Sequence, residues 1–330
     1  MTSEVSQRAR AFVAERLPEA RGLGQALAEL IDEPDEFVAV ARAGFERLSD
    51  EEYAAEQERV APGSGLVFGV RWPLIQAVSG QLRGPLEEGT SSSALWLAQR
   101  LATEPERELR LFGLEPLKRA LPDDPERSWQ LLRRLARGAG DWVTVDTLAE
   151  LYSLGILYEP VRWAEIEQLA YSDNRWERRL VGSSIARMPF HLPRHSRSEL
   201  RRLDALTLIK SLLGDNDEQV QKALGWALRE WAQVDPAGVA DLLRAEAATA
   251  RTTSDGHRAW VLRDALPALP SLAPELRERL AGIRRHADNP STSAAAQTAA
   301  AFMGAGGLHG TSDRAVSMQG DRQRAAERAR

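Results

Sequence analysis

Cysteine is absent from the sequence, and lysine occurs only as Lys118, Lys210 and Lys222. Without cysteine the chain has no disulfide bonds, thiolate metal sites or cysteine nucleophiles. No apolar run approaches the roughly 18 residues that a membrane-spanning helix needs. The N-terminal stretch MTSEVSQRARAF also lacks the apolar core of a secretory signal. Together these absences predict a cytoplasmic protein that does not associate with membranes.

The sequence does contain pervasive helical periodicity. Apolar residues recur at three- and four-residue intervals in stretches such as EFVAVARAGFERL, VTVDTLAELYSLGIL and VQKALGWALREWA. Short polar breaks, among them LPDDPE, GAGD, SDN, GDND and VDP, separate these stretches and supply typical helix starts. No alternating pattern of any length indicates a β-strand. The sequence therefore predicts an all-α fold.

The arrangement of these helices favours a curved α-solenoid of antiparallel helix pairs. A spacing of roughly 35–45 residues per pair is typical of HEAT-like repeats, whose concave side forms a binding surface. We predict three parts along the chain: acidic N-terminal helices in residues 1–55, the HEAT-like array in residues 56–286, and a disordered tail rich in Ala, Gly, Ser and Arg in residues 287–330.

Charge is unevenly distributed over the chain, whose net charge is −5. Residues 1–55 contain twelve acids and six arginines, whereas residues 174–211 contain nine bases and three acids. A basic segment in an acidic protein can bind phosphates. The alternative, which charge alone favours, is a solvated helix face that is rich in arginine because the chain hardly uses lysine.

Signals for metals and cofactors are weak. His191 and His195 have the spacing of two ligands on a helix, but Pro193 lies between them and no carboxylate completes a ligand set. The GAGG stretch at 304–307 does not follow a strand, so it is not a phosphate-binding loop of the usual kind. We therefore expect neither a metal nor a cofactor.

Two of the nine tryptophans have neighbours that indicate a site. Trp142 and Asp146 are four residues apart and share one helix face, while Asp141 is the natural N-cap of that helix and leaves Asp146 free. Trp226 and Arg229 are three residues apart on another helix. The remaining tryptophans that we expect in the core are Trp96, Trp129, Trp163 and Trp176.

A pair of arginines follows the break SDN. Asp173 or Asn174 can cap the next helix, whose first turn then carries Arg178 and Arg179 at the positive end of the helix dipole, where phosphate binds favourably. A structural explanation is available for each of these features. Trp-x-x-x-Asp pairs are common on helices, and paired arginines at a helix start are usually solvated.

Five stretches together resemble the AlkD-like family of DNA alkylation-repair glycosylases, and they occur in the family's order. They are FGVRWPLIQAV (68–78), ERELRLFGLEPLK (106–118), DWVTVDTLAELY (141–152), AYSDNRWERRLV (170–181) and VQKALGWALREWAQVDPAGVADLL (220–243). The resemblance covers about residues 56–275 and implies an all-α solenoid of HEAT-like repeats with a basic concave groove.

The resemblance also implies roles for individual residues. The family's catalytic aspartate corresponds to Asp146, and the two tryptophans of its site correspond to Trp142 and Trp226. The arginine that holds the backbone phosphate at the lesion corresponds to Arg179. A further phosphate contact corresponds to Arg229, and we add Arg178, the neighbour of Arg179, to the predicted phosphate-binding residues.

Three positions depart from the family pattern. The family often has Trp-Trp-Asp where this chain has Asp141, Trp142 and Val143. An aromatic residue of the family's early helix has no clear counterpart, and Tyr53 is the candidate. Trp72 stands where the family usually has a small polar residue. These departures concern the surroundings of the lesion, so they bear on which lesions the protein accepts.

The function that the resemblance implies is a monofunctional DNA glycosylase without a cofactor. It would hydrolyse the N-glycosidic bond of cationic alkylpurines, such as N3-methyladenine and N7-methylguanine, in duplex DNA, with Asp146 stabilising the oxocarbenium-like sugar. The family leaves the lesion in the duplex without a base pocket. We expect a monomer that binds alkylated double-stranded DNA at the nucleoid of a bacterial-type cell. The alternative is a non-catalytic HEAT-repeat scaffold that binds DNA or protein.

Overall fold

The computed structural model describes residues 2–286 and 288–306, and the regular secondary structure in these ranges is helical. Only two isolated β-bridges occur there, between Ser49 and Val70 and between Leu66 and Glu106. The predicted all-α fold is confirmed. The α-helices are α1 (Thr2–Ala28), α2 (Pro34–Arg47), α3 (Glu51–Val60), α4 (Trp72–Glu88), α5 (Ser91–Leu101), α6 (Arg107–Phe112), α7 (Leu114–Ala120), α8 (Pro125–Gly138), α9 (Trp142–Tyr158), α10 (Trp163–Leu169), α11 (Arg175–Arg187), α12 (Arg202–Leu212), α13 (Glu218–Trp231), α14 (Pro236–Thr253), α15 (Gly256–Ala265), α16 (Ala273–Arg279) and α17 (Ala294–Gly306). The 3-10 helices are η1 (Pro160–Arg162), η2 (Met188–His191), η3 (Arg194–Glu199) and η4 (Leu266–Ala268).

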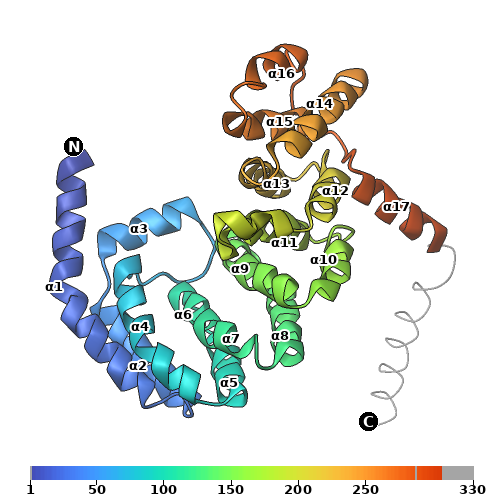
Figure 1. The fold of residues 1–330 in the computed structure, drawn as a ribbon. Helices are drawn as coiled ribbons and strands as arrows, with labels where there is room; N and C mark the ends of the chain where they lie inside the picture. The colour runs from blue at the N-terminus through green and yellow to red at the C-terminus, as the bar shows by residue number, and fades with distance from the viewer. Residues whose placement is uncertain (1, 287, 307–330) are drawn as a thin grey trace, which may run out of the picture.

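The helices follow one another in chain order through an extended array, with α1 near one end and α14 to α16 at the other (Figure 1). In the middle of the array α11 packs between α9 and α13, and α13 in turn packs against α15. Each helix of this row is covered by the next one, which is the packing expected of an α-solenoid. None of the described helices is long and apolar enough to cross a membrane.

Polar residues in the predicted breaks begin the helices of the middle section. Asp141 caps α9 by accepting a hydrogen bond from the Thr144 N–H at 2.9 Å, as predicted. Asn174, rather than Asp173, caps α11, and Asp217 caps α13 in the same way. A capping side chain typically stabilises a helix by about 1 kcal/mol. The breaks thus fix where each of these three helices starts.

A glycine sets the distance between α11 and α13. A Cβ added at Gly182 would lie only 2.9 Å from the Ala223 Cβ, closer than real side chains approach. Any larger residue at position 182 would therefore push the two helices apart. Because these helices carry Arg179 and Trp226, the glycine also fixes the spacing of predicted site residues.

The acidic N-terminal segment belongs to the same core as the rest of the array. Along α1, Ala20, Leu23 and Leu27 are buried, and the helix packs lengthwise against α4. The buried side chains of both helices join the core that continues through the array. The predicted boundary after residue 55 falls inside α3, and the division of the chain into three parts stays a prediction.

The connection between α3 and α4 has no regular secondary structure but is tied to α6. The Glu108 carboxylate accepts hydrogen bonds from the backbone N–H groups of Phe68, Gly69 and Val70 at 3.2, 2.8 and 3.4 Å. Gly69 has a φ of +79°, and a Cβ there would lie 2.5 Å from the Asp50 carbonyl oxygen, so only glycine fits. This contact fixes the connection against α6.

The C-terminal residues that the structure describes form a helix where we expected disorder. The Ser293 hydroxyl accepts a hydrogen bond from the Ala296 N–H at 3.2 Å and starts α17, which packs against α12. Alanine, the main component of this segment, has the highest helix propensity, which explains the difference from the prediction. Residues 307–330 of the predicted disordered tail lie outside the described residues.

The tryptophans expected in the core have different environments. Trp129 is buried as predicted, and Trp163 and Trp176 are half-buried against the core. Trp96 is 58% exposed, so its predicted place in the core is wrong. The buried side of α5 is formed instead by Ala94, Leu95, Leu97, Ala98 and Leu101.

Candidate active site around Asp146

Asp146 on α9 and Arg179 on α11 form a two-point ion pair. The Arg179 Nε donates to Asp146 Oδ1 at 3.0 Å, and Nη2 donates to Oδ2 at 2.6 Å. Parallel contacts of this kind are among the stronger charge-assisted hydrogen bonds in proteins. Arg179 is only 6% exposed, whereas the Asp146 side chain remains 17% exposed. The carboxylate is therefore the partner that stays accessible.

Ser183, one helical turn after Arg179, completes the surroundings of this carboxylate. Its hydroxyl donates to Asp146 Oδ1 at 2.6 Å. Three hydrogen bonds from α11 consequently orient Asp146, and one of its roughly four lone-pair sites remains open. Ser183 was not among the predicted residues, although its position four residues after Arg179 on the same helix face was the available signal.

Arg179 has few donors left for a ligand. Its Nη1 donates to the Gln219 carbonyl at 2.7 Å and faces the Gln219 side-chain oxygen at 3.3 Å. With the two bonds to Asp146, four of the five guanidinium N–H groups are directed at protein atoms. The predicted contact of Arg179 with a phosphate stays a prediction, and the structure shows that Arg179 also holds Asp146.

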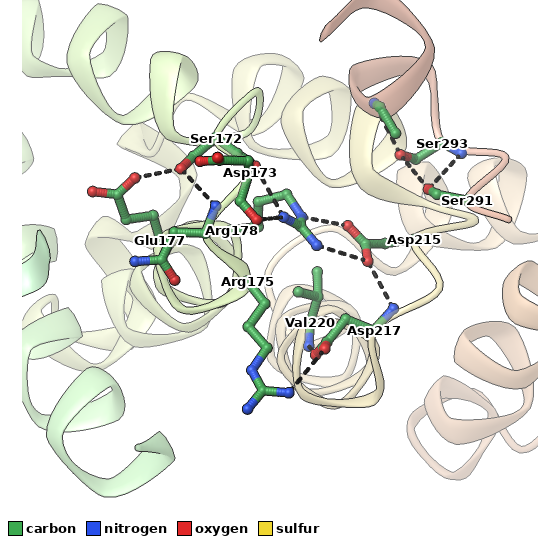
Figure 2. Close-up of polar contacts among 12 residues, drawn as sticks. Ser172, Asp173, Arg175, Glu177, Arg178, Asp215, Asp217, Val220, Ser291 and Ser293 are labelled. Carbon is green, nitrogen blue, oxygen red and sulfur yellow. Dashed lines mark hydrogen bonds and ion pairs between the residues drawn. The ribbon is translucent and has the colours of Figure 1, made fainter. Parts of the chain in front are cut away.

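Arg178 lies close to Arg179 in sequence but faces another part of the molecule. Figure 2 shows its guanidinium reaching from α11 to Asp215 in the turn before α13, where Nε donates at 2.7 Å. Its Nη1 also donates to the carbonyls of Ser172 and Asp173, each at 2.9 Å. Arg178 thus joins the turn before α11 to the turn before α13, and its predicted contact with a phosphate stays untested.

Arg229 on α13 is paired but accessible. Its Nη1 donates to the Asp264 carbonyl at 3.0 Å and contacts the Asp264 carboxylate. Both side chains are about one-third exposed, at 34% and 35%. Exposed ion pairs are weak because water screens them. Arg229 can therefore exchange this partner for a phosphate at lower cost than Arg178 or Arg179.

Trp226 on α13 lies against Arg187, a cation that was not predicted from the sequence. The ring is half-buried, its Nε1 donates to Glu230 at 3.2 Å, and the Arg187 guanidinium carbon lies 5.4 Å from the ring centroid. This is a cation–π distance. The buried Nε of Arg187 has no hydrogen-bond partner within the described part of the chain. Arg187 ends α11, eight residues after Arg179, and no motif distinguishes it.

Trp142 begins α9 and is half-buried one turn before Asp146, as the spacing predicted. Among the described residues, no hydrogen bond joins Asp146 to Trp142 or to Trp226; its hydrogen-bond partners are Arg179 and Ser183. The structure thus brings Asp146 together with Arg179 directly. Trp142 and Trp226 belong to the helices on either side of α11.

A cavity of about 320 Å³ lies between α9 and the helices before it, and of the side chains described above only Arg187 lines it. Its walls come from α3, α4, α6, α7, α9 and α11, and they include Tyr53, Trp72, Lys118, Thr147 and Arg187. Tyr53, the candidate for the family's early aromatic residue, therefore lies in a cavity that α9 also lines. Arg187 connects the cavity to Trp226, because it lines the first and stacks on the second.

The basic segment 174–211 is largely balanced by acids. Arg175, Arg178, Arg179, Arg201 and Lys210 each lie within 4 Å of a carboxylate from the same or a neighbouring helix. Much of the local positive charge is thus compensated inside the protein. The basic concave groove that we expected stays a prediction.

The fold and this group of side chains define the class of protein: an all-α protein of stacked helices with a partly exposed carboxylate on α9 that α11 holds in place. A sequence model of the DNA alkylation repair enzymes matches residues 41–268, and the chain belongs to this family. The match spans all six predicted site residues. Family membership supports a role in the repair of alkylation damage, with DNA as the implied partner.

A solved structure supports the fold assignment. It is described as a predicted DNA alkylation repair enzyme from Enterococcus faecalis, and it superposes with a TM-score of 0.51 over 60% of this chain and 89% of that chain. The two sequences are 18% identical, so this likeness concerns the fold alone. A search of curated protein sequences found no match.

Proposed function

We propose that the protein is a monofunctional DNA glycosylase that hydrolyses the N-glycosidic bond of cationic alkylated purines in double-stranded DNA. Its substrates would be lesions of the N3-methyladenine and N7-methylguanine type. The observation that carries this proposal is the Asp146 carboxylate, partly exposed and oriented by Arg179 and Ser183. It stands at the position that resembles the family's catalytic aspartate.

The chemistry of the lesion suits a site with one carboxylate. A cationic base leaves as a neutral molecule, so no general acid is needed to protonate it. Positive charge instead develops on the sugar, as in other glycoside hydrolyses. A preorganised carboxylate beside the sugar stabilises that charge, and the open lone pair of Asp146 can orient the attacking water. Arg179 partly offsets the negative charge, so the sugar must lie nearer to Asp146 than to the guanidinium.

The remaining predicted residues would bind the DNA around the lesion. The faces of Trp142 and Trp226 would hold the deoxyribose, because aromatic rings attract a nearby positive charge. Arg229 and the remaining N–H of Arg179 would contact backbone phosphates. For Arg178 we propose an indirect role, since its contacts with Asp215 fix the start of α11. The protein would act as a monomer at the nucleoid, without a metal or cofactor.

The test is release of free base from duplex DNA that contains N7-methylguanine, comparing the wild type with Asp146→Asn. Asparagine keeps the shape of the side chain but removes its charge, so we expect the rate to fall by at least about 100-fold. Asp123→Asn is the matched control, because Asp123 forms an exposed ion pair with Arg119 on α7. Failure of the wild type to release base would exclude the glycosylase, and undiminished release by Asp146→Asn would exclude the role of Asp146.

The second candidate is a non-catalytic HEAT-repeat scaffold for DNA or protein. It is favoured by the internal pairing of the basic segment, which leaves Arg175, Arg178 and Arg179 with acidic partners. The same experiment distinguishes the two functions. A scaffold would bind the damaged duplex, or ignore it, without releasing any base.

A further inference from the structure

Asp264 on α15 places a carboxylate beside two predicted site residues of α13. It forms an ion pair with Arg229, whose Nη1 also donates to the Asp264 carbonyl oxygen at 3.0 Å. Arg229 and Trp226 are three residues apart and share one face of α13, so the ion pair lies near the ring that would hold the sugar. The carboxylate therefore occupies the place that a DNA phosphate bound to Arg229 would need.

A glycine in α13 makes room for this carboxylate. The three atoms nearest to a Cβ added at Gly225 all belong to the Asp264 side chain, and the Cβ would overlap its carboxylate. Gly225 lies within the regular helix and has no positive φ, so the backbone itself does not require a glycine. Glycine inside a helix is less favourable than alanine. Room for the Asp264 carboxylate is thus the feature of the described structure that accounts for Gly225.

The pair is accessible enough to exchange its partner. The Arg229 and Asp264 side chains are 34% and 35% exposed, whereas the Asp215 carboxylate that holds Arg178 is only 1% exposed. Water weakens an ion pair of this kind, and a phosphate oxygen accepts the same hydrogen bonds from a guanidinium as a carboxylate oxygen does. Because two anions repel each other, a phosphate at Arg229 must displace the Asp264 carboxylate.

We propose that Asp264 competes with the DNA backbone for Arg229, holding this arginine in the free protein and weakening the binding of every duplex that contacts it. This inference rests on the proposed function, which gives Arg229 a contact with a backbone phosphate. Backbone contacts carry no sequence information, so the competition affects damaged and undamaged DNA alike. Its consequence is a shorter stay of the protein on DNA that has no lesion.

The first test measures the affinity for an undamaged duplex by fluorescence anisotropy at low salt. Asp264→Asn should bind about 3–10-fold more tightly than the wild type, because Arg229 is then free for a phosphate. Gly225→Ala should also tighten binding, although it leaves the net charge unchanged, because the added methyl group turns the Asp264 side chain away from α13. Asp241→Asn is the matched control: Asp241 pairs with Arg244 on α14, and its loss should change the affinity by less than about 2-fold.

The second test repeats Asp264→Asn in an Arg229→Gln background. If Asp264 acts through Arg229, most of the gain in affinity should disappear there. An equal gain in both backgrounds would show a general repulsion between Asp264 and DNA. Weaker binding by Asp264→Asn in the wild-type background would show that Asp264 supports the phosphate contact. Either result would overturn the proposal.

Release of base by the wild type from N7-methylguanine DNA, measured alongside, separates this inference from the glycosylase function. Tighter binding by Asp264→Asn and Gly225→Ala without any release of base by the wild type would contradict the glycosylase and leave the competition supported. Release of base by the wild type, with no tighter binding by either variant, would do the reverse.

Discussion

Asp146 has its orientation fixed before any DNA arrives. Arg179 and Ser183 bind the same carboxylate from one face of α11, and Gln219 of α13 holds Arg179 in turn. A group arranged in this way needs little reorganisation when charge develops on a substrate, which is how preorganised sites lower a barrier. At the scale of single residues, the site is thus a chain of contacts through three helices that ends at one accessible carboxylate.

Ser183 is the residue in which this arrangement can be tested most cleanly. Ser183→Ala removes one hydrogen bond to a charged group, so we expect kcat for base release to fall by about 10-fold with KM for damaged DNA nearly unchanged. Ser183→Thr should restore most of the rate. Ser184→Ala is the control, because Ser184 is equally buried but its hydroxyl has no partner within the described structure. A loss confined to KM would contradict the positioning role.

Sequence spacing predicted which of these residues share one helix and where that helix starts. Trp142 and Asp146 share a helix face because they are four residues apart. Asp141 caps the helix because it directly precedes the first helical residue. Ser183 and Arg187 could not be found in this way, because their roles depend on how α11 lies against α9 and α13. The ion pair of Arg179 with Asp146 was not predicted for the same reason. The two residues are 33 positions apart, and a DNA phosphate was the partner that we expected for Arg179.

At the scale of helices, the contact between α11 and α13 depends on Gly182. Gly182→Ala places a Cβ against the Ala223 Cβ and the neighbouring backbone of α13, so we expect the free energy of unfolding to fall by about 1–3 kcal/mol. Chemical denaturation measures this change. Gly84→Ala in α4 is the control, since nothing lies within 4 Å of its added Cβ and alanine there should stabilise the helix by about 0.5–1 kcal/mol. A stabilised Gly182→Ala would contradict the close approach.

The segment after α11 is held to α9 by a histidine whose state depends on pH. The Ser153 hydroxyl donates to the Glu150 carbonyl, so the His191 Nε2, 2.7 Å away, donates to Ser153. Burial lowers the pKa of His191 below its ordinary value of 6.5. The unfolded chain therefore binds the proton more readily, and this group's contribution to stability is lost as the pH falls from 7 through the lowered pKa.

Thermal denaturation between pH 7.5 and pH 5 would reveal this contribution as a difference between variants. Between pH 7.5 and pH 5, His191→Asn should lose less thermal stability than the wild type, because asparagine does not take up a proton. His195→Asn, at an exposed position on η3, should leave the pH dependence as it is. Parallel curves for the wild type and His191→Asn would rule out this role for His191.

At the scale of the whole molecule, α1 extends the array beyond the segment that matches the family, residues 41–268. Leu27 of α1 is fully buried, so Leu27→Ala should lower the free energy of unfolding by about 2–4 kcal/mol and shift one single transition. Leu66→Ala, at a 63% exposed leucine, should have little effect. A separate early transition confined to the N-terminal helices, followed by calorimetry, would show that they fold as a unit of their own.

The helical architecture could be predicted from the sequence, but the positions where the array begins and ends could not. Apolar periodicity predicted the helices and the breaks between them because each helix buries one stripe against its neighbours. The ends of the array were not predictable from composition. The described acids of α1 and α2 are exposed, whereas Leu23, Leu27 and Phe37 on the same helices are buried, and the alanines of α17 form a helix rather than a flexible tail. The overall composition of a segment reflects mainly the exposed face of its helices and does not reveal which apolar residues are buried.

The contact of Glu108 with the connection between α3 and α4 has a consequence for the evolution of this chain. The Glu108 carboxylate of α6 constrains the length of the segment before α4, because the N–H groups of Phe68, Gly69 and Val70 all donate to its oxygens. A residue inserted or deleted there would also displace Tyr53 and Trp72 from the cavity that they line. Relatives with a connection of another length should therefore differ at position 108 as well, and the shape of the cavity should change with them.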